Sequence, residues 1–147
     1  MKILFICGCL EPWRDGVGDY SLYLAETLAG HGHQVECVAL NDKYVSSEDC
    51  YSKHKTRRSH DSIQVFRFSS LTTWIRRFIL LREHIDSCGP DWISLQYVPY
   101  SFSAKGIPFI FTFNLIYLRG PWKWHIMFHE LWIRRQNCIK FFIASLL

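Results

Sequence analysis

Short apolar runs alternate with polar segments along the chain, and their length is that of buried strands. The first run follows Met1 and stops at Gly8 without a small-residue cleavage site, so it is better interpreted as a strand than as a signal peptide. Apolar runs of this length predict strands that are covered on at least one face. The predicted strands are residues 2–7, 34–40, 63–68, 91–96 and 124–131.

Between the strands, apolar positions return at helical spacing. A first stripe predicts a helix that begins at Gly18 or Asp19 and ends at Gly30. Its members are Tyr20, Leu24, Leu28 and His31, with Tyr23 and Thr27 beside them. A second stripe predicts a helix that ends at Gly89 and Pro90. Its members are Trp74, Phe78, Leu81, Ile85 and Cys88.

Two further segments complete the predicted organisation. Residues 107–119 fit a strand or a helix by pattern, but a parallel sheet needs a crossover here, so we predict a helix. Residues 41–61 are polar and charged and predict a surface loop. The order of elements predicts an α/β fold, a Rossmann-like, mostly parallel sheet with helices on both faces. One domain is expected over residues 1–132, and residues 133–147 begin a truncated continuation.

The composition fits one folded domain. The chain has 147 residues, 49% hydrophobic and 20% charged, which is enough for one core but not for two lobes with a cleft. The net charge of +4 is spread among apolar segments, which argues against nucleic-acid binding and suits an acidic ligand or an anionic membrane surface. Arg76, Arg77 and Arg82 are expected on a solvated helix face, with anionic lipid head groups as the alternative contact.

The cysteine pattern indicates a compartment. Cys7, Cys9 and Cys37 lie in or beside apolar runs, so we expect reduced, buried thiols rather than disulfides. The longest apolar stretch, residues 107–118, is shorter than the roughly 20 residues of a membrane span. We therefore expect a cytoplasmic protein, with peripheral contact at the inner face of the membrane as the alternative.

The loop after the first strand carries the first candidate chemistry, because ligands bind beyond the carboxyl ends of parallel strands. Gly16 and Gly18 stand at the entrance to the first helix, where glycine permits close backbone approach and free N–H groups attract phosphate. Alternatively, these glycines only make the turn. A dinucleotide site with Asp42 on the ribose is disfavoured, because Ser21 occupies the third glycine position of the G-x-G-x-x-G fingerprint.

Three segments together resemble the N-terminal domain of family 4 glycosyltransferases, which have the two-lobed GT-B architecture. Residues 15–35 resemble its glycine loop, helix and small-x-Gly-His-x-Val turn. Residues 90–97 resemble its Pro-Asp-hydrophobic strand, and residues 125–132 its strand that ends in a histidine and an acidic residue. Each motif is weak alone, but their order and spacing match the family from residue 1 to about 132.

The resemblance implies transfer of a sugar from a nucleotide-diphosphate donor, with retention of anomeric configuration and without a metal or another cofactor. It implies that Gly16, Val17 and Gly18 approach the donor phosphates and that His129 lies beside the reacting sugar. The acceptor would be a glycan, a lipid or a small molecule. The candidate residues on the acceptor side are Arg14, Asp19, Tyr20, Tyr97 and Glu130.

Two features depart from the family. Asp15 stands where members often have a glycine, and the second lobe that binds the nucleotide would lie beyond residue 147. The chain is therefore expected to be the acceptor-side lobe and incomplete as an enzyme, and the alternative is a stand-alone Rossmann-like interaction domain. His125 and His129 could instead be core residues or zinc ligands, although no H-E-x-x-H motif accompanies them.

Overall fold

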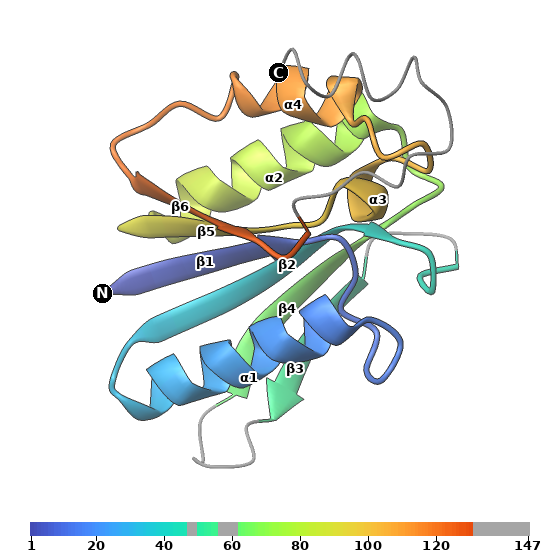
Figure 1. The fold of residues 1–147 in the computed structure, drawn as a ribbon. Coiled ribbons are helices and arrows are strands. Elements are labelled where there is room, and N and C mark those ends of the chain that lie inside the picture. Colours follow the sequence, from blue (N-terminus) through green and yellow to red (C-terminus); the bar gives the residue numbers. More distant parts are fainter. Residues whose placement is uncertain (47–49, 56–61, 131–147) are drawn as a thin grey trace.

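The computed structural model describes residues 1–46, 50–55 and 62–130 and contains a six-stranded sheet between two layers of helices (Figure 1). The continuation expected at residues 133–147 lies outside the described residues. The strand order is β3-β4-β2-β1-β5-β6, and every neighbouring pair except β3 with β4 is parallel. The parallel strands are β1 (Lys2–Cys7), β2 (Gln34–Asp42), β4 (Ser62–Ser69), β5 (Trp92–Tyr97) and β6 (Lys123–Phe128).

The helices cover both faces of the sheet, so the predicted Rossmann-like α/β fold is confirmed. Helix α1 lies on one face, and α2 and α4 lie on the other (Figure 1). The Thr73 hydroxyl caps the start of α2, and Gly89 ends it in the left-handed conformation with φ of 55°. The helices are α1 (Gly16–Gly30), α2 (Trp74–Cys88), α3 (Pro99–Phe102) and α4 (Phe109–Leu115).

Each face of the sheet has its own apolar core, because successive strand residues point to opposite faces. On the α2 face, Leu4 and Ile6 of β1 pack with Leu81 and Ile85 of α2. On the α1 face, Phe5 and Cys7 of β1 pack with α1 side chains, among them Leu22 and Ala25. The thiols of Cys7, Cys9 and Cys37 are free and buried, as predicted.

The first helix differs from the prediction in its start and in its buried face. It begins at Gly16 rather than at Gly18 or Asp19, because the Asp15 carboxylate caps it. Its buried residues are Gly18, Ser21, Leu22, Ala25 and Glu26, whereas Tyr20 and Tyr23 are 40% and 55% exposed. The predicted stripe was therefore wrong at its aromatic positions, and mainly small residues let α1 lie close to the sheet.

Three other boundaries were also wrong. Residues 41–61 are not one loop, because β3 (Cys50–Lys55) pairs antiparallel with β4 at the edge of the sheet. The helix predicted over residues 107–119 is the shorter α4, and a short helix, α3, precedes it. The last strand begins at Lys123, and Leu131, where it was predicted to end, lies outside the described residues.

The topology fixes where a ligand site can form. The chain moves from β1 to β2 in one direction and from β5 to β6 in the other, so the order reverses between β1 and β5. Loops that leave the carboxyl ends of these two strands diverge at such a point, and ligands of open α/β sheets bind there. The loop after β1, the start of α1 and the ends of β5 and β6 therefore border the expected ligand position.

Candidate active site

A row of four hydrogen-bonded polar side chains crosses β5 and β6 on the α1 face. We call His125, Ser94, Gln96 and His129 the polar row. The Ser94 hydroxyl lies 2.9 Å from His125 Nδ1 and accepts a hydrogen bond of 2.8 Å from Gln96 Nε2. The other end of the Gln96 amide, Oε1, lies 2.9 Å from His129 Nε2. Ser94 and Gln96 are 4% and 1% exposed, so the row is anchored inside the protein.

The polar row has a direction, which fixes the proton of His129. Because the Gln96 amide donates to Ser94, its carbonyl oxygen faces His129, and His129 Nε2 must be the donor. Neutral His129 therefore carries its proton on Nε2 and presents Nδ1 as an acceptor. The Ser94 hydroxyl, which accepts from the Gln96 amide, is also hydrogen-bonded to His125 Nδ1.

His129 is held at the carboxyl end of β6 by contacts from two elements, β5 and α1. Its backbone N–H donates to the Tyr97 carbonyl at 3.1 Å, which continues the pairing of β5 with β6. The Tyr20 ring of α1 meets the imidazole edge-on, with 5.2 Å between ring centroids and 74° between planes. Two predicted site residues, Tyr20 and His129, are thus neighbours at the predicted edge of the sheet.

The alternative interpretation of His125 and His129 as core residues is not observed. His125 is exposed and His129 is half-buried. One ring nitrogen of each histidine is already engaged, by Ser94 and by Gln96 respectively. The alternative in which His125 is a core residue is therefore wrong.

The start of α1 is capped by the protein's own carboxylate. Asp15 Oδ1 accepts from Val17 N–H at 2.9 Å and from Gly18 N–H at 3.4 Å. The Asp19 N–H donates to the Asp15 carbonyl, and the Asp19 side chain accepts from Trp13 N–H. The N–H groups of Val17 and Gly18 are therefore occupied, and an approaching phosphate would compete with Asp15 for them.

Gly16 and Gly18 face different surroundings. A Cβ atom added at Gly18 would collide with the backbone carbonyl of Cys9, so this glycine allows the loop after β1 to pack on α1. A Cβ atom added at Gly16 would meet nothing within 4 Å. The requirement for glycine is thus internal packing at position 18, whereas position 16 is open to an external group.

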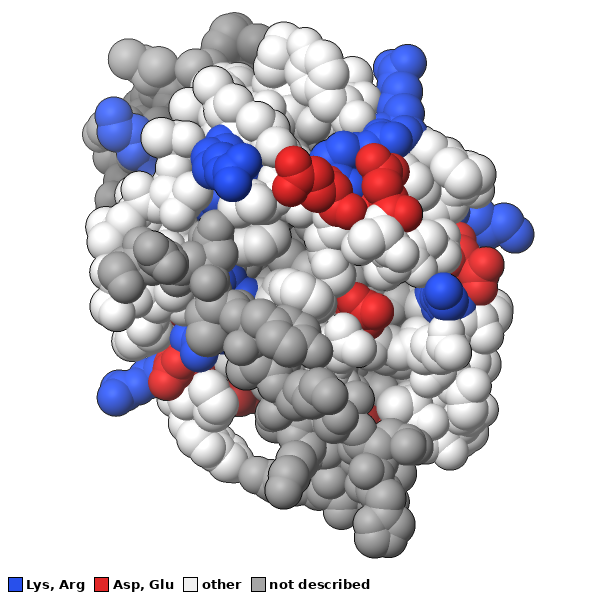
Figure 2. Space-filling view, turned by 180° about the vertical axis from the view of Figure 1, so that it is seen from behind, with Lys and Arg blue, Asp and Glu red and all other residues white. Residues whose placement is uncertain are grey.

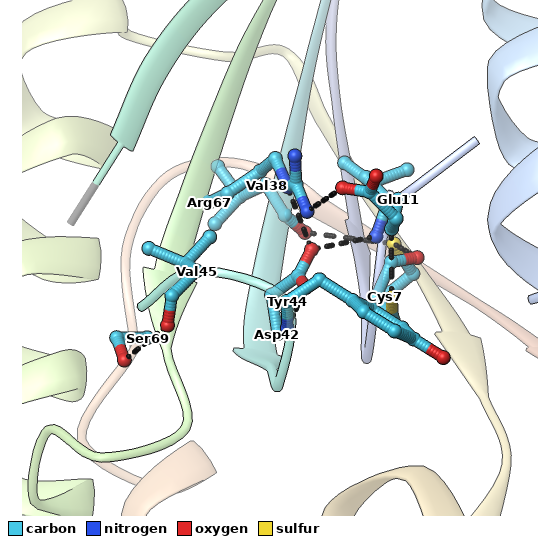
Figure 3. Close-up of polar contacts among 10 residues, drawn as sticks. Cys7, Glu11, Val38, Asp42, Tyr44, Val45, Arg67 and Ser69 are labelled. Carbon is cyan, nitrogen blue, oxygen red and sulfur yellow. Dashed lines mark hydrogen bonds and ion pairs between the residues drawn. The ribbon is translucent and has the colours of Figure 1, made fainter. Parts of the chain in front are cut away.

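A partly buried ion-pair network ties the loop after β1 to two strand ends (Figure 3). Arg67 of β4 donates through Nε to Asp42 Oδ2 at 2.7 Å and through Nη2 to Glu11 Oε2. Asp42 also accepts from the backbone N–H groups of Leu10 and Tyr44. Asp42, considered above for a ribose, is instead fully buried and committed to this network.

The network holds both partners in their charged forms. Burial alone would raise the pKa of the Asp42 carboxyl, but the hydrogen bond from Arg67 and those from two backbone N–H groups keep it below its ordinary value. The hydrogen bond with Asp42 raises the pKa of Arg67, against the effect of burial. Arg67 is therefore committed to linking the loop after β1 to the strand ends, and it is not available as a cation for phosphate.

None of the contacts described for the remaining predicted residues joins their side chains to the His129 ring. Arg14 stands over the Tyr44 ring at 5.7 Å, near the end of β2. Tyr97 packs on the α2 face, stacked on Phe102 with 6.0 Å between centroids, while burial raises its pKa. Glu130 follows His129 and is exposed. Their roles on the acceptor side stay predictions.

Arg77 corrects the expected arginine face. It is only 3% exposed, and its guanidinium donates to the Leu40 carbonyl at 2.6 Å and to Asn41 Oδ1 at 2.7 Å. It also stacks over the Trp74 ring at 3.9 Å. Arg77 is therefore a buried link from α2 to the end of β2, and it is not part of a solvated surface with Arg76 and Arg82.

On the face that Figure 2 shows, basic and acidic side chains are interspersed among uncharged ones, so charge of one sign is not concentrated there.

Two cavities, of about 630 and 710 Å³, open near the amino ends of the strands, and neither is lined by a residue of the polar row. Among the described residues, no helix has the length and apolar character that a membrane crossing requires.

Comparisons with known proteins identify the family. The family model described as Glycosyltransferase Family 4 matches residues 14–145, a range that includes the start of α1 and the whole polar row. Neither the comparison with curated proteins nor the one with solved structures gives a match. Because the family model covers most of the chain, and the fold around the polar row is Rossmann-like, this protein belongs to glycosyltransferase family 4.

Proposed function

We propose that this chain is the acceptor-side lobe of a retaining glycosyltransferase of GT-B architecture that uses a nucleotide-diphosphate sugar and no metal in the reaction. The observation that carries the proposal is His129, which projects from the end of β6 with one ring nitrogen fixed by a buried amide. Family membership supports sugar transfer as the reaction class. A second Rossmann-like lobe would supply the nucleotide site.

His129 would act on the transferred sugar. With Nε2–H bound to Gln96, its Nδ1 can accept from a sugar hydroxyl, or it can take a proton and donate to a developing negative charge. Fixing the ring before the substrate arrives removes a reorganisation cost from the transition state. An interaction that strengthens as charge develops raises kcat and does more than tighten binding.

The loop before α1 would receive the donor phosphates at Gly16, with Val17 and Gly18 contributing backbone N–H groups once Asp15 turns away. Tyr20 would line the same edge, because its ring already lies against His129. The helix dipole favours an anion at this position. Donor phosphate and transferred sugar would thus meet at the loop after β1 and the end of β6.

The test is sugar transfer by a protein that joins this chain to a second, nucleotide-binding lobe. His129→Ala is expected to lower kcat by roughly 10- to 1000-fold, the range for loss of one positioned polar group, with little change in melting temperature. The matched control is His31→Ala, an exposed histidine at the far end of α1. It should leave kcat unchanged.

Full activity of the His129→Ala protein would refute the role of His129. The stereochemical part is checked separately, by assigning the anomeric configuration of the product by NMR. An inverted product would refute retention while leaving the assignment of the lobe intact.

A further inference from the structure

A three-residue cluster lies near the amino ends of the parallel strands, whereas His129 lies at their carboxyl ends. Glu36 comes from the start of β2 and reaches the last turns of α2, where His84 and Cys88 are four residues apart and share a helix face. Their carboxylate oxygen, imidazole nitrogen and thiol sulfur all lie within 4.8 Å of one another. Among the described residues, this is a compact set of three different metal-binding side chains.

Two atoms of the cluster are buried without a hydrogen bond. Glu36 Oε2 and His84 Nε2 lie 2.9 Å apart, yet their mutual orientation does not make a hydrogen bond, and neither has another partner among the described residues. A buried polar atom without a partner costs about 1–3 kcal/mol, so two such atoms at one point need an explanation. A cation between them would satisfy both.

The identity of the ligand atoms selects the cation. Nitrogen, oxygen and sulfur ligands at about 2.0–2.3 Å are those of zinc, whereas magnesium and calcium take oxygen alone. Ligand atoms in a tetrahedral zinc site are separated by about 3–4 Å, close to the spread of these three atoms. The Phe66 ring packs on the His84 imidazole, with 3.9 Å between centroids, and holds it in place.

The cluster also borders a space for a further ligand. Glu36 and Cys88 line the cavity of about 630 Å³ together with Lys2, His33 and Gln64. A zinc ion with three protein ligands keeps a fourth position for water or another small ligand. This arrangement is independent of the sugar-transfer edge and of the proposed function.

We propose that Glu36, His84 and Cys88 bind a zinc ion, with the fourth position open to this cavity. The ion ties the end of α2 to the start of β2. The competing explanation is an ion pair between Glu36 and His84 without a metal, in which Cys88 is not a ligand.

The test is titration of the metal-free, full 147-residue chain with Co²⁺, which reports zinc sites by its absorption spectrum. We expect one equivalent to bind with visible bands of a tetrahedral site and a near-ultraviolet band from thiolate to metal. Zn²⁺ should displace it. Cys88→Ser should abolish the thiolate band, and His84→Gln should weaken binding by more than about 100-fold, since loss of outer-shell partners alone costs about 10- to 100-fold.

Matched controls come from the same chain. One control is His33→Ala, because His33 lines the cavity but lies outside the cluster. The other controls, Cys9→Ser, Cys50→Ser and Cys138→Ser, remove other thiols. All four should keep the spectrum. Persistence of the thiolate band in Cys88→Ser, its loss in one of the other thiol variants, or no binding at all would overturn the proposal. If Cys88→Ser does not fold, X-ray absorption of the zinc-loaded original chain decides, with one sulfur at about 2.3 Å expected and none overturning the site.

Discussion

Ser94 and Gln96 link the two histidines of the candidate site by hydrogen bonds, although neither residue was predicted as a site residue from the sequence. The strand motif that contains them was recognised, and so were His129 and Tyr20. The available signal was the spacing of two polar residues, i and i+2, within a buried parallel strand. Such residues share one face and need partners there. What the sequence cannot show is which partner on β6 lies opposite, because this depends on strand register.

Removing the Gln96 amide should free the ring of His129. In Gln96→Leu, His129 Nε2 loses its acceptor, so the single tautomer should become a mixture, and unfolding should cost about 1–3 kcal/mol less because Ser94 also loses a donor. Long-range proton–nitrogen NMR spectra of the imidazoles measure the tautomer. A His129 ring that is already mixed in the original protein would contradict the assigned direction of the polar row.

The two glycines before Tyr20 should respond oppositely to alanine. Gly18→Ala forces a methyl group against the Cys9 carbonyl and should lower the free energy of unfolding by about 1–3 kcal/mol. Gly16→Ala meets open space at a helical position and should be neutral or stabilising by up to about 1 kcal/mol. Urea unfolding measures both. Equal effects would show that Gly18 is not packed as described.

At the scale of elements, the sequence pattern located the strands that are buried, and it missed the strand that is defined by its hydrogen-bonded pairing alone. Strands β1, β2, β4 and β5 are apolar because they are buried in the middle layer, so the pattern alone locates them. The edge strand Cys50–Lys55 pairs on one side only and has a polar sequence, so its pattern resembles a loop. The buried face of α1 was misassigned because packing close to a sheet favours Gly18 and Ala25 over Tyr20.

The Asp42–Arg67 pair should be a main determinant of how the loop after β1 joins the strands. Arg67→Met leaves a buried carboxylate without its cation and should destabilise the protein by about 3–5 kcal/mol. Asp42→Asn keeps one of the two acceptor oxygens that the N–H groups of Leu10 and Tyr44 use, and it should cost less. The control is Arg82→Met in the exposed pair with Asp86, worth less than about 1 kcal/mol. Denaturant unfolding at pH 7 ranks the three variants.

The same pair predicts a pH dependence. The pKa of Asp42 is lowered in the folded protein, so its stabilisation is complete above the unfolded value of about 4 and is lost as the pH falls through the folded value. The stability difference between the original protein and Asp42→Asn should therefore shrink below about pH 4. A difference that stays constant down to pH 2 would show that the carboxylate charge contributes nothing.

For the molecule as a whole, we expect the isolated chain to bind nucleotide-diphosphate sugars weakly, with a Kd above about 1 mM, and to turn none over. The start of α1 offers few N–H groups to a phosphate, and two of them are occupied by Asp15. Isothermal titration calorimetry with a panel of donors measures this. Micromolar affinity would mean that the second lobe matters less for the donor than we propose.

The carboxylate that caps α1 has a consequence for such an enzyme. If the donor diphosphate binds at the start of α1 as we propose, Asp15 already places a negative charge there before the donor arrives. An entering diphosphate must exchange with it, and the free energy of that exchange is subtracted from donor affinity. The same exchange favours departure of the spent nucleotide, because Asp15 can then cap the N–H groups of Val17 and Gly18 again.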